Sequence, residues 1–142
     1  MTFDDLRTGQ ALPELVVPIT ASAIVAGAIA TNDFENVHHD KAAAQATGVP
    51  DIFMNILTTN GFVQRFVTDW AGANARIRRI AIRLGAPNFA GDVMKLSGEV
   101  AAIDPAARTA EIRVSGRNGI GEHVAATVTI GFAAGGFAEG VR

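Results

Sequence analysis

The residues best suited to chemistry are a carboxylate and an imidazole, Asp33 and His38, in the segment Asp-Phe-Glu-Asn-Val-His. Five positions along a helix place two side chains about 140° apart, and five along a strand place them on opposite faces. Only an irregular turn brings such a pair together, and residues 31–36 are rich in the turn formers Thr, Asn and Asp. We therefore expect a turn in which the two side chains face one point and share a proton-transfer task.

The spacing alone leaves other interpretations of these residues open. Asp33 could cap the turn while His38 lies on the surface. His39 could serve as the base in place of its neighbour, although adjacent side chains usually diverge. His38, His39 and Asp40 are consecutive, and because consecutive residues seldom chelate one ion, we expect no metal site. The third histidine, His123, is expected to be exposed at the start of a strand.

Length and composition indicate a single globular domain over residues 1–142, with residues 134–142 as a flexible tail. The chain is 49% hydrophobic and 18% charged, which suffices for one sizeable core. A net charge of −2 gives no general attraction to nucleic acid or to an anionic membrane, so neither is an expected partner. The absence of cysteine excludes disulfides and a thiol nucleophile. Acidic residues near the start and short apolar stretches lead us to expect a cytoplasmic protein.

Hydrophobic periodicity and turn residues predict the elements that position the pair. One helix is expected over 21–30 with Thr20 as its N-cap, and a short one from the cap Asp40 to Thr47. A long helix over 52–70 is apolar on most sides and should be buried. Strand-like segments cover residues 12–18, 77–84, 93–103, 109–116 and 124–132. The economical solution is an α+β fold, with a curved antiparallel sheet of about five strands wrapped around the long helix.

The segment Gly116-Arg-Asn-Gly-Ile-Gly121 superficially resembles a phosphate-binding loop. It joins two predicted strands, however, and no helix follows it. Because a phosphate loop needs a helix N-terminus behind it, we predict a hairpin turn instead.

The order of these elements, with Asp33, Val37 and His38, resembles the MaoC-like hot-dog family of (R)-specific enoyl-CoA hydratases. The motif of that family has Asp, then Asn, Pro, an aliphatic residue and His. Glu35 and Asn36 stand here in place of the usual Asn and Pro. The chain thus keeps the Asp, the aliphatic residue and the His of the motif, and it differs from the motif at Glu35 and Asn36.

The departures resemble one branch of the family, the small MaoC-like subunit of heteromeric hydratases from bacterial steroid side-chain degradation. Asn32 replaces the Gly that usually precedes the Asp, and Met54-Asn55 replaces a His-Gly pair that usually opens the long helix. The likeness covers about residues 12–132. It is carried by Val37-His38-His39-Asp40, Asp51-Ile52-Phe53, Asn55-Ile56-Leu57, Val67-Thr68-Asp69-Trp70-Ala71-Gly72, Arg83-Leu84-Gly85, Ser97-Gly98-Glu99-Val100 and Gly116-Arg117-Asn118.

This resemblance implies reversible addition of water to a 2-enoyl-CoA thioester, with a steroid side-chain CoA ester as the expected substrate. Asp33 and His38 would hold one water, take its proton and deliver a proton to the α-carbon. The backbone amide of Asn55 would stabilise the thioester oxyanion at the start of the long helix. The other expected substrate-binding residues are Phe53, Met54 and Asn36. We expect no cofactor, because CoA is part of the substrate.

The resemblance also implies a partner, either a second MaoC-like subunit in a heterodimer or heterotetramer or a second copy in a homodimer. A lone sheet around one helix would leave an unpaired edge and an exposed helix flank. Two other functions stay open: a hot-dog acyl-CoA thioesterase with Asp51 or Asp69 as the water-activating carboxylate, and a non-catalytic subunit shaping a partner's acyl tunnel. Four arginines could contact CoA phosphates or form a charged strand face or subunit contact: Arg76, Arg78, Arg79 and Arg83.

Overall fold

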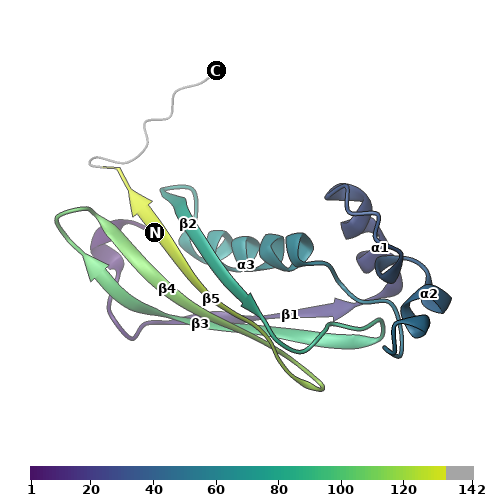
Figure 1. Ribbon diagram of the computed structural model, residues 1–142. Coiled ribbons are helices and arrows are strands. Elements are labelled where there is room, and N and C mark those ends of the chain that lie inside the picture. The colour runs from purple at the N-terminus through teal and green to yellow at the C-terminus, as the bar shows by residue number, and fades with distance from the viewer. Residues whose placement is uncertain (134–142) are drawn as a thin grey trace.

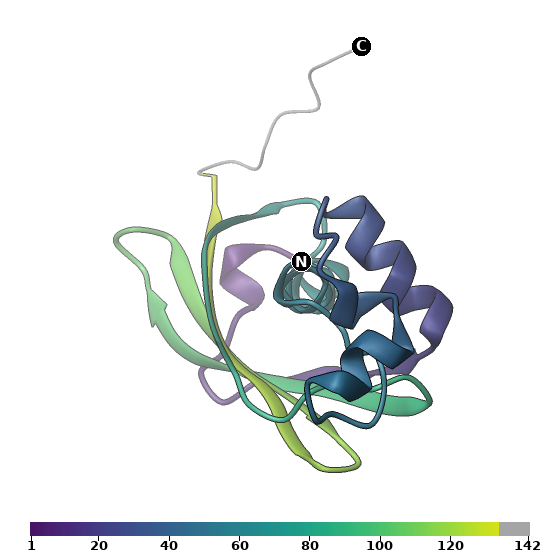
Figure 2. The ribbon, with the colours of Figure 1, turned by 45° about the vertical axis from the view of Figure 1, so that its right-hand side comes forward.

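A five-stranded antiparallel sheet curves around one long helix in the computed structural model, which describes residues 1–133 (Figures 1 and 2). The strands are β1 (Ala11–Ile19), β2 (Ala75–Leu84), β3 (Asp92–Asp104), β4 (Thr109–Asn118) and β5 (Gly121–Phe132). Their order across the sheet is β1-β3-β4-β5-β2, so β1 and β2 form its two edges. The predicted α+β architecture is confirmed, whereas the predicted tail at 134–142 lies outside the described residues.

Within the described residues, three α-helices and two 3₁₀ helices complete the fold. They are η1 (Phe3–Asp5), α1 (Ala21–Ala30), η2 (Asn36–His38), α2 (Lys41–Ala46) and α3 (Ile56–Ala71). The sheet wraps around α3 (Figure 2), and α1 and α2 lie together beside one end of that helix (Figure 1). No helix within residues 1–133 is both long and apolar enough to cross a membrane.

The core lies between the concave face of the sheet and α3. Side chains alternate along β3, so Met94 and Leu96 are fully buried while Lys95 between them is exposed. On α3, Val63 and Val67 are four residues apart and therefore share the buried face. The alternating pattern of the strands and the 3.6-residue pattern of the long helix thus identify the side chains that pack against each other in the core.

Both predicted caps beside the turn are confirmed. The side chain of Thr20 accepts a hydrogen bond from the backbone N–H of Ala23 at 3.0 Å, and Asp40 accepts one from Ala43 at 3.1 Å. Between the two helices the backbone reverses at Asn32, whose φ of 56° is a left-handed conformation that Asn tolerates better than most residues. The predicted irregular turn is therefore present, and η2 occupies its second half.

The start of the long helix was predicted four residues too early. Residues 52–55 are not helical: Phe53 forms an isolated antiparallel bridge with Phe89, and the backbone N–H of Met54 donates to the carbonyl of Asn88 at 3.0 Å. These contacts with a segment more than thirty residues away fix the extended backbone. Apolar composition alone could not reveal them.

The long helix is also less completely buried than predicted. Ile56 and Leu57, in its first turn, are 49% and 51% exposed. The sheet covers one face of α3, and Gly27 of α1 packs against Thr58, but Ile56 and Leu57 in the first turn point outward.

The predicted hairpin between β4 and β5 is confirmed. The side chain of Asn118 accepts hydrogen bonds from the backbone N–H groups of Ile120 and Gly121, both at 3.0 Å. This pattern closes a tight turn in which a side chain takes the place of a backbone acceptor.

Candidate active site

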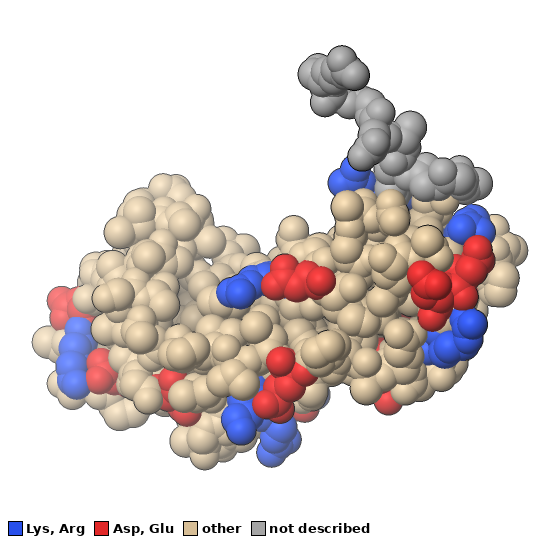
Figure 3. All heavy atoms as spheres, turned by 180° about the vertical axis from the view of Figure 1, so that it is seen from behind, with Lys and Arg blue, Asp and Glu red and all other residues tan. Residues whose placement is uncertain are grey.

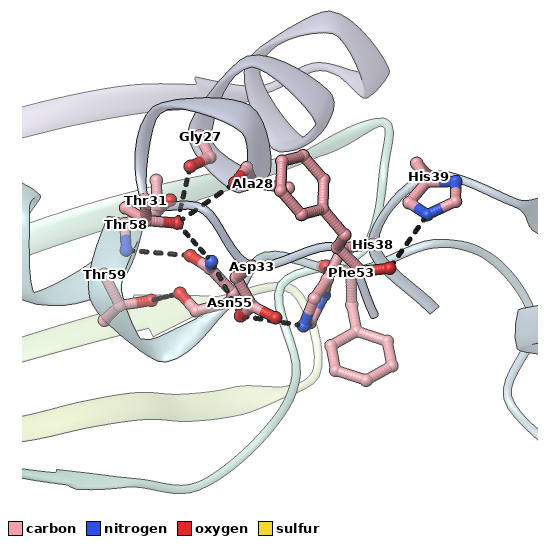
Figure 4. A network of polar contacts seen from close by, with 11 residues as sticks. Gly27, Ala28, Thr31, Asp33, His38, His39, Phe53, Asn55, Thr58 and Thr59 are labelled. Carbon is pink, nitrogen blue, oxygen red and sulfur yellow. Dashed lines mark hydrogen bonds and ion pairs between the residues drawn. The ribbon is translucent and has the colours of Figure 1, made fainter. Parts of the chain in front are cut away.

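Asp33 and His38 face each other across the turn that follows α1 (Figure 4). The His38 Nε2 atom lies 3.5 Å from Asp33 Oδ2. The backbone N–H of Asp33 donates to the carbonyl of Ala28 at 2.9 Å, which ties the turn to the end of α1. The convergence expected from the five-residue spacing is therefore confirmed, and it depends on the turn and on η2 rather than on a regular element.

The imidazole of His38 is held in one orientation and one tautomer. The residue is only 7% exposed, and its Nδ1 atom lies 2.7 Å from the carbonyl oxygen of Phe53. Because a carbonyl can only accept, Nδ1 carries the proton, and in the neutral ring Nε2 is an unprotonated acceptor. The Phe53 ring also packs edge-on against the imidazole, with 5.2 Å between ring centroids. The free lone pair of Nε2 consequently points toward Asp33.

One oxygen of the Asp33 carboxylate is anchored by an amide. Asn55 Nδ2 donates to Asp33 Oδ2 at 2.9 Å and to Thr31 Oγ1 at 2.7 Å. The Thr31 hydroxyl in turn donates to the carbonyl of Gly27 at 2.8 Å. The Asp33 side chain keeps 25% of its surface exposed, and within the described residues no hydrogen bond uses its Oδ1 atom. The carboxylate is thus fixed on one side and open on the other.

The N-terminus of α3 points at the same place. Asn55 is the N-cap, and its side-chain oxygen accepts the backbone N–H of Thr58 at 2.8 Å. The backbone N–H of Asn55 itself has no acceptor among the residues that the structure describes. A free amide at the positive end of a sixteen-residue helix is suited to a developing negative charge, so its oxyanion role stays a prediction with a compatible geometry.

The other predicted substrate-binding residues are placed differently from one another. Phe53 is half-buried and contacts His38 directly. Met54 is 3% exposed and is enclosed by the core. Asn36 is exposed at the start of η2, where its carbonyl accepts from the two residues that follow that helix. The structure therefore brings Phe53 to the pair, but gives Met54 a core position.

His39 does not face the carboxylate. Its Nε2 atom lies 3.2 Å from the carbonyl of Phe34, the side chain is exposed, and Figure 4 shows the ring directed away from Asp33. It is therefore poorly placed to replace its neighbour as the base. Within residues 1–133, no group of three or more His, Cys, Asp or Glu side chains is arranged to hold a metal ion.

The expectation that His123 is exposed is wrong. The residue is 1% exposed, its Nδ1 lies 2.6 Å from the carbonyl of Ala86, and its Nε2 lies 2.8 Å from the Thr59 hydroxyl. Burial lowers the pKa of His123 below its ordinary 6.5. The register between β4 and β5 shifts beside it, and this bulge lets both His123 and Val124 turn inward. Alternation along a regular strand cannot predict such a pair.

Apolar side chains are exposed on the elements that carry the site. Four large ones on α1, on the turn after it and on the first turn of α3 are 49–62% exposed: Ile29, Phe34, Ile56 and Leu57. A hollow of about 270 Å³ lies between α1 and α3, and its lining includes Gly27, Thr31, Leu57 and Phe62. α1 carries no charged residue, and the surface over it is uniformly tan at the upper left of Figure 3. The lining of this hollow is mostly apolar and also includes Arg65, and neither Asp33 nor His38 belongs to it.

The four arginines of β2 lie away from this surface, along one edge of the sheet. All four side chains are exposed, as a charged strand face requires. The Nη2 atom of Arg83 lies 3.8 Å from Oε1 of Glu122. Nothing in the arrangement singles out one of them for a phosphate group.

The main feature that sequence reasoning missed is the side chain of Asn55. Its backbone amide was expected to act, but its carboxamide is what contacts Asp33. An Asn directly before a helix is a strong N-cap signal, and this signal could have indicated the bond to Thr58. The contact with Asp33, twenty-two residues away, has no counterpart in local pattern.

Comparison with known proteins places this geometry in context. The model of the MaoC like domain matches residues 7–120. The 3-oxo-4,17-pregnadiene-20-carboxyl-CoA hydratase beta subunit of Mycobacterium tuberculosis is 50% identical over 122 residues, which are 86% of this chain and 93% of that protein. The likeness predicted from the residues around Asp33 and His38 is therefore confirmed over most of the chain.

Solved structures agree with the sequence comparison. A chain of the ChsH1-ChsH2 complex from Mycobacterium tuberculosis matches with a TM-score of 0.86 and 47% identity, over 89% of this chain and 98% of that one. An (R)-hydratase from A. caviae involved in PHA biosynthesis matches with a TM-score of 0.81 over 91% of this chain and 98% of that one. At 21% identity the second match shows a shared fold alone, and it confirms the predicted hot-dog architecture.

Proposed function

The chain belongs to the MaoC-like domain family. We propose that it is the catalytic subunit of an enoyl-CoA hydratase and that its Asp33–His38 pair transfers the protons. The observation that supports this most directly is the pair itself, with 3.5 Å between His38 Nε2 and Asp33 Oδ2. A neutral imidazole and a carboxylate are both acceptors, and a water on the exposed side that reaches His38 Nε2 and Asp33 Oδ1 can donate one proton to each. The alternative of a non-catalytic subunit would not require this arrangement.

In the proposed reaction, one water adds across the 2,3 double bond of an acyl-CoA thioester. As the water oxygen bonds to the β-carbon, its proton passes to the Asp33–His38 pair, and a proton is returned from the pair to the α-carbon. Negative charge builds on the thioester oxygen, where the free N–H of Asn55 and the helix dipole would stabilise it. The thioester supplies the activation of the α-carbon, so the proposal includes no metal or cofactor.

We propose a steroid CoA ester with a shortened, unsaturated side chain as the substrate. The half-identical relative is named for such a compound, 3-oxo-4,17-pregnadiene-20-carboxyl-CoA. Exposed apolar side chains on α1, on the turn and on α3 support a bulky apolar group, because Ile29, Phe34 and Leu57 would lose water contact beneath it. CoA would enter as part of the substrate.

We propose a second MaoC-like subunit as the partner. The related chain of known structure comes from a complex of two proteins, ChsH1 and ChsH2. The edge strands β1 and β2 and the exposed first turn of α3 are surfaces that a second subunit would cover. The cytoplasmic location expected from the sequence stays a prediction.

The carboxylates that a thioesterase would use are already engaged elsewhere. Asp51 is paired with Lys41 at 2.7 Å, and the hydrogen bond from the Lys41 ammonium lowers the pKa of this carboxyl below its usual value. Asp69 is exposed and paired with Arg65 at 3.2 Å. Neither belongs to the hydrogen-bonded network around Asp33, so the geometry favours hydration over thioester hydrolysis.

The test is an assay of the purified chain, alone and with a MaoC-like partner, that follows loss of enoyl-thioester absorbance. We expect full activity only with the partner and a preference for the steroid thioester over crotonyl-CoA. If the isolated chain hydrates crotonyl-CoA as efficiently as any steroid thioester, the steroid assignment is wrong. Release of free CoA without hydration would replace the hydratase proposal with a thioesterase.

A further inference from the structure

The side chain of Asn55 is the best-connected polar group beside the reacting pair, and the proposed reaction gives it no task. Asn55 is 3% exposed, and its carboxamide makes three hydrogen bonds. We propose that Asn55 is a positioning residue that sets the rotation of the Asp33 carboxylate and so decides which oxygen meets the water. This inference rests on the proposed function and deepens it.

The geometry explains how one amide can fix a carboxylate. The rotation of a carboxylate about its terminal bond is a soft, broad torsion that the chain itself does not fix. The two N–H bonds of an amide diverge in a fixed plane, and one of them is directed to Thr31, which is itself bonded to Gly27. The amide oxygen is held by the first turn of α3. These two contacts fix the plane of the amide and so the direction of its second N–H bond. Asp33 Oδ2 lies in that direction, 2.9 Å from Asn55 Nδ2.

The anchored oxygen leaves the other one available. His38 Nε2 also lies near Oδ2, at 3.5 Å. Both Asn55 Nδ2 and His38 Nε2 are therefore placed against the same oxygen of the Asp33 carboxylate. The remaining oxygen, Oδ1, is the one left for a water on the exposed side. Because a reacting group must be held within a few tenths of an ångström, loss of the amide would misplace the water rather than remove a reacting group.

The pattern of donors and acceptors selects Asn over other helix-capping residues. The position requires an acceptor for the Thr58 N–H and, from the same side chain, a donor for Asp33. Ser would keep the cap and lose the bridging amide, while Asp would keep the cap and set a second carboxylate beside the first. A residue chosen for the cap alone would not need the amide, which points to a role toward Asp33.

The test compares three variants of the full chain with its partner subunit. Asn55→Ser keeps a helix cap but removes the amide, Asn55→Asp keeps the cap but adds a like charge, and Asn74→Ser is the matched control. Asn74 also donates through its amide, to the carbonyl of Met1 at 3.3 Å, and takes no part in the Asp33 network. Thermal melting confirms that each variant is folded before its kinetics are read.

We expect kcat of Asn55→Ser to fall about 10- to 100-fold with KM nearly unchanged, the range for one lost hydrogen bond to a charged group. Asn55→Asp should also move the acid limb of the pH–rate profile to higher pH, because two adjacent carboxylates resist ionising together. Asn74→Ser should match wild type. A folded Asn55→Ser protein with wild-type kcat, or an unmoved limb in Asn55→Asp, would overturn the proposal.

A second measurement separates this inference from the proposed function. The ¹³Cγ resonance of Asp33, assigned by its loss in Asp33→Asn, reports the carboxylate environment whether or not the chain hydrates anything. We expect the resonance to shift in Asn55→Ser and to stay in place in Asn74→Ser. If the wild type is inactive but the resonance shifts in Asn55→Ser, only the hydratase proposal is contradicted. An unshifted resonance contradicts the positioning role.

Discussion

Two buried histidines in this chain are held in the same way and stand in different surroundings. His38 donates from Nδ1 to the Phe53 carbonyl at 2.7 Å, and His123 donates from Nδ1 to the Ala86 carbonyl at 2.6 Å. Both rings therefore present an unprotonated Nε2 atom. The Nε2 atom of His38 faces a partly exposed carboxylate, whereas that of His123 faces a threonine hydroxyl inside the core.

The two sites differ in what Nε2 faces and not in how the ring is fixed. A backbone carbonyl sets the tautomer in both cases, but the group at Nε2 and its access to water decide what the ring can do. His38 has a carboxylate neighbour, Asp33, whose side chain keeps 25% of its surface exposed. His123 is sealed between α3 and the loop after β2, where it can only hold elements together. The comparison predicts that the two sites fail in different ways when altered.

The largest expected effect is loss of activity from the first site. His38→Ala and Asp33→Asn should each lower the rate of hydration about 10²- to 10⁴-fold, because each removes a proton-transfer group, and the fold should survive. Steady-state rates with the partner subunit provide the measurement. His39→Ala is the matched control and should have far less effect, since its ring faces away. If His39→Ala were the crippling change, the assignment of the pair would be wrong.

The second site should show the reverse pattern, a loss of stability with little loss of chemistry. His123→Ala leaves a cavity and removes the ring that bonds both Thr59 and the Ala86 carbonyl. We expect the free energy of unfolding to fall by about 2–4 kcal/mol, as for other large-to-small changes in a core. Urea denaturation measures it, and kcat per folded molecule should stay within a few-fold of wild type. If His123→Ala were stable but had lost its kcat, the assignment of a purely structural role to His123 would be wrong.

The response to pH sharpens the same contrast. Burial lowers the pKa of His123 below its ordinary 6.5, so between these two values the unfolded chain binds more protons than the folded chain. The contribution of this residue to stability is therefore fully present above about pH 6.5 and is lost as the pH falls toward the lowered pKa. The two described partners of the ring, Thr59 and the Ala86 carbonyl, carry no charge.

The check is urea denaturation of wild type and His123→Gln between pH 5 and 8. The wild type should lose more stability on the acidic side, and the difference between the two curves isolates His123 from the carboxylates that titrate in both. Parallel curves through pH 6.5 would show that burial does not shift this group.

The sequence predicted the turn that brings Asp33 and His38 together well, because its signals are local. Asp33 and His38 are five residues apart among turn formers, and the flanking helices are capped by Thr20 and Asp40, the residues that capping preferences indicate. Alternation likewise predicted all five strands, although each extends a residue or more beyond its apolar pattern. Local steric and hydrogen-bonding preferences are strong enough to define these features.

The sequence predicted poorly whatever depends on a distant contact. The extended segment before α3 is held by the bridge between Phe53 and Phe89, and the amide of Asn55 finds Asp33 across twenty-two residues. His123 is buried by a bulge whose position depends on the register of two strands. Each of these features is set by tertiary pairing, for which a window of neighbouring residues carries no signal.

The smallest expected effect concerns the hydroxyl that lies between the second histidine and the first site. Thr59 Oγ1 lies 2.8 Å from His123 Nε2, to which its single proton is donated, and 3.2 Å from the carbonyl of Asn55, so this residue lies beside both regions. Thr59→Val keeps the shape of the side chain and removes the hydroxyl. The buried Nε2 atom then loses its donor, at a cost of about 1–2 kcal/mol of stability.

The effect of Thr59→Val on activity decides how separate the two regions are. Asn55 keeps its bonds to Asp33, Thr31 and Thr58 in this variant, because none of them uses the Thr59 hydroxyl. We therefore expect kcat to change less than about threefold, which corresponds to under 1 kcal/mol. Urea denaturation and steady-state kinetics on the same preparation give both values. A fall in kcat as large as that of Asn55→Ser would mean that the core histidine acts on the reacting pair through Thr59, and the two regions would have to be treated as one site.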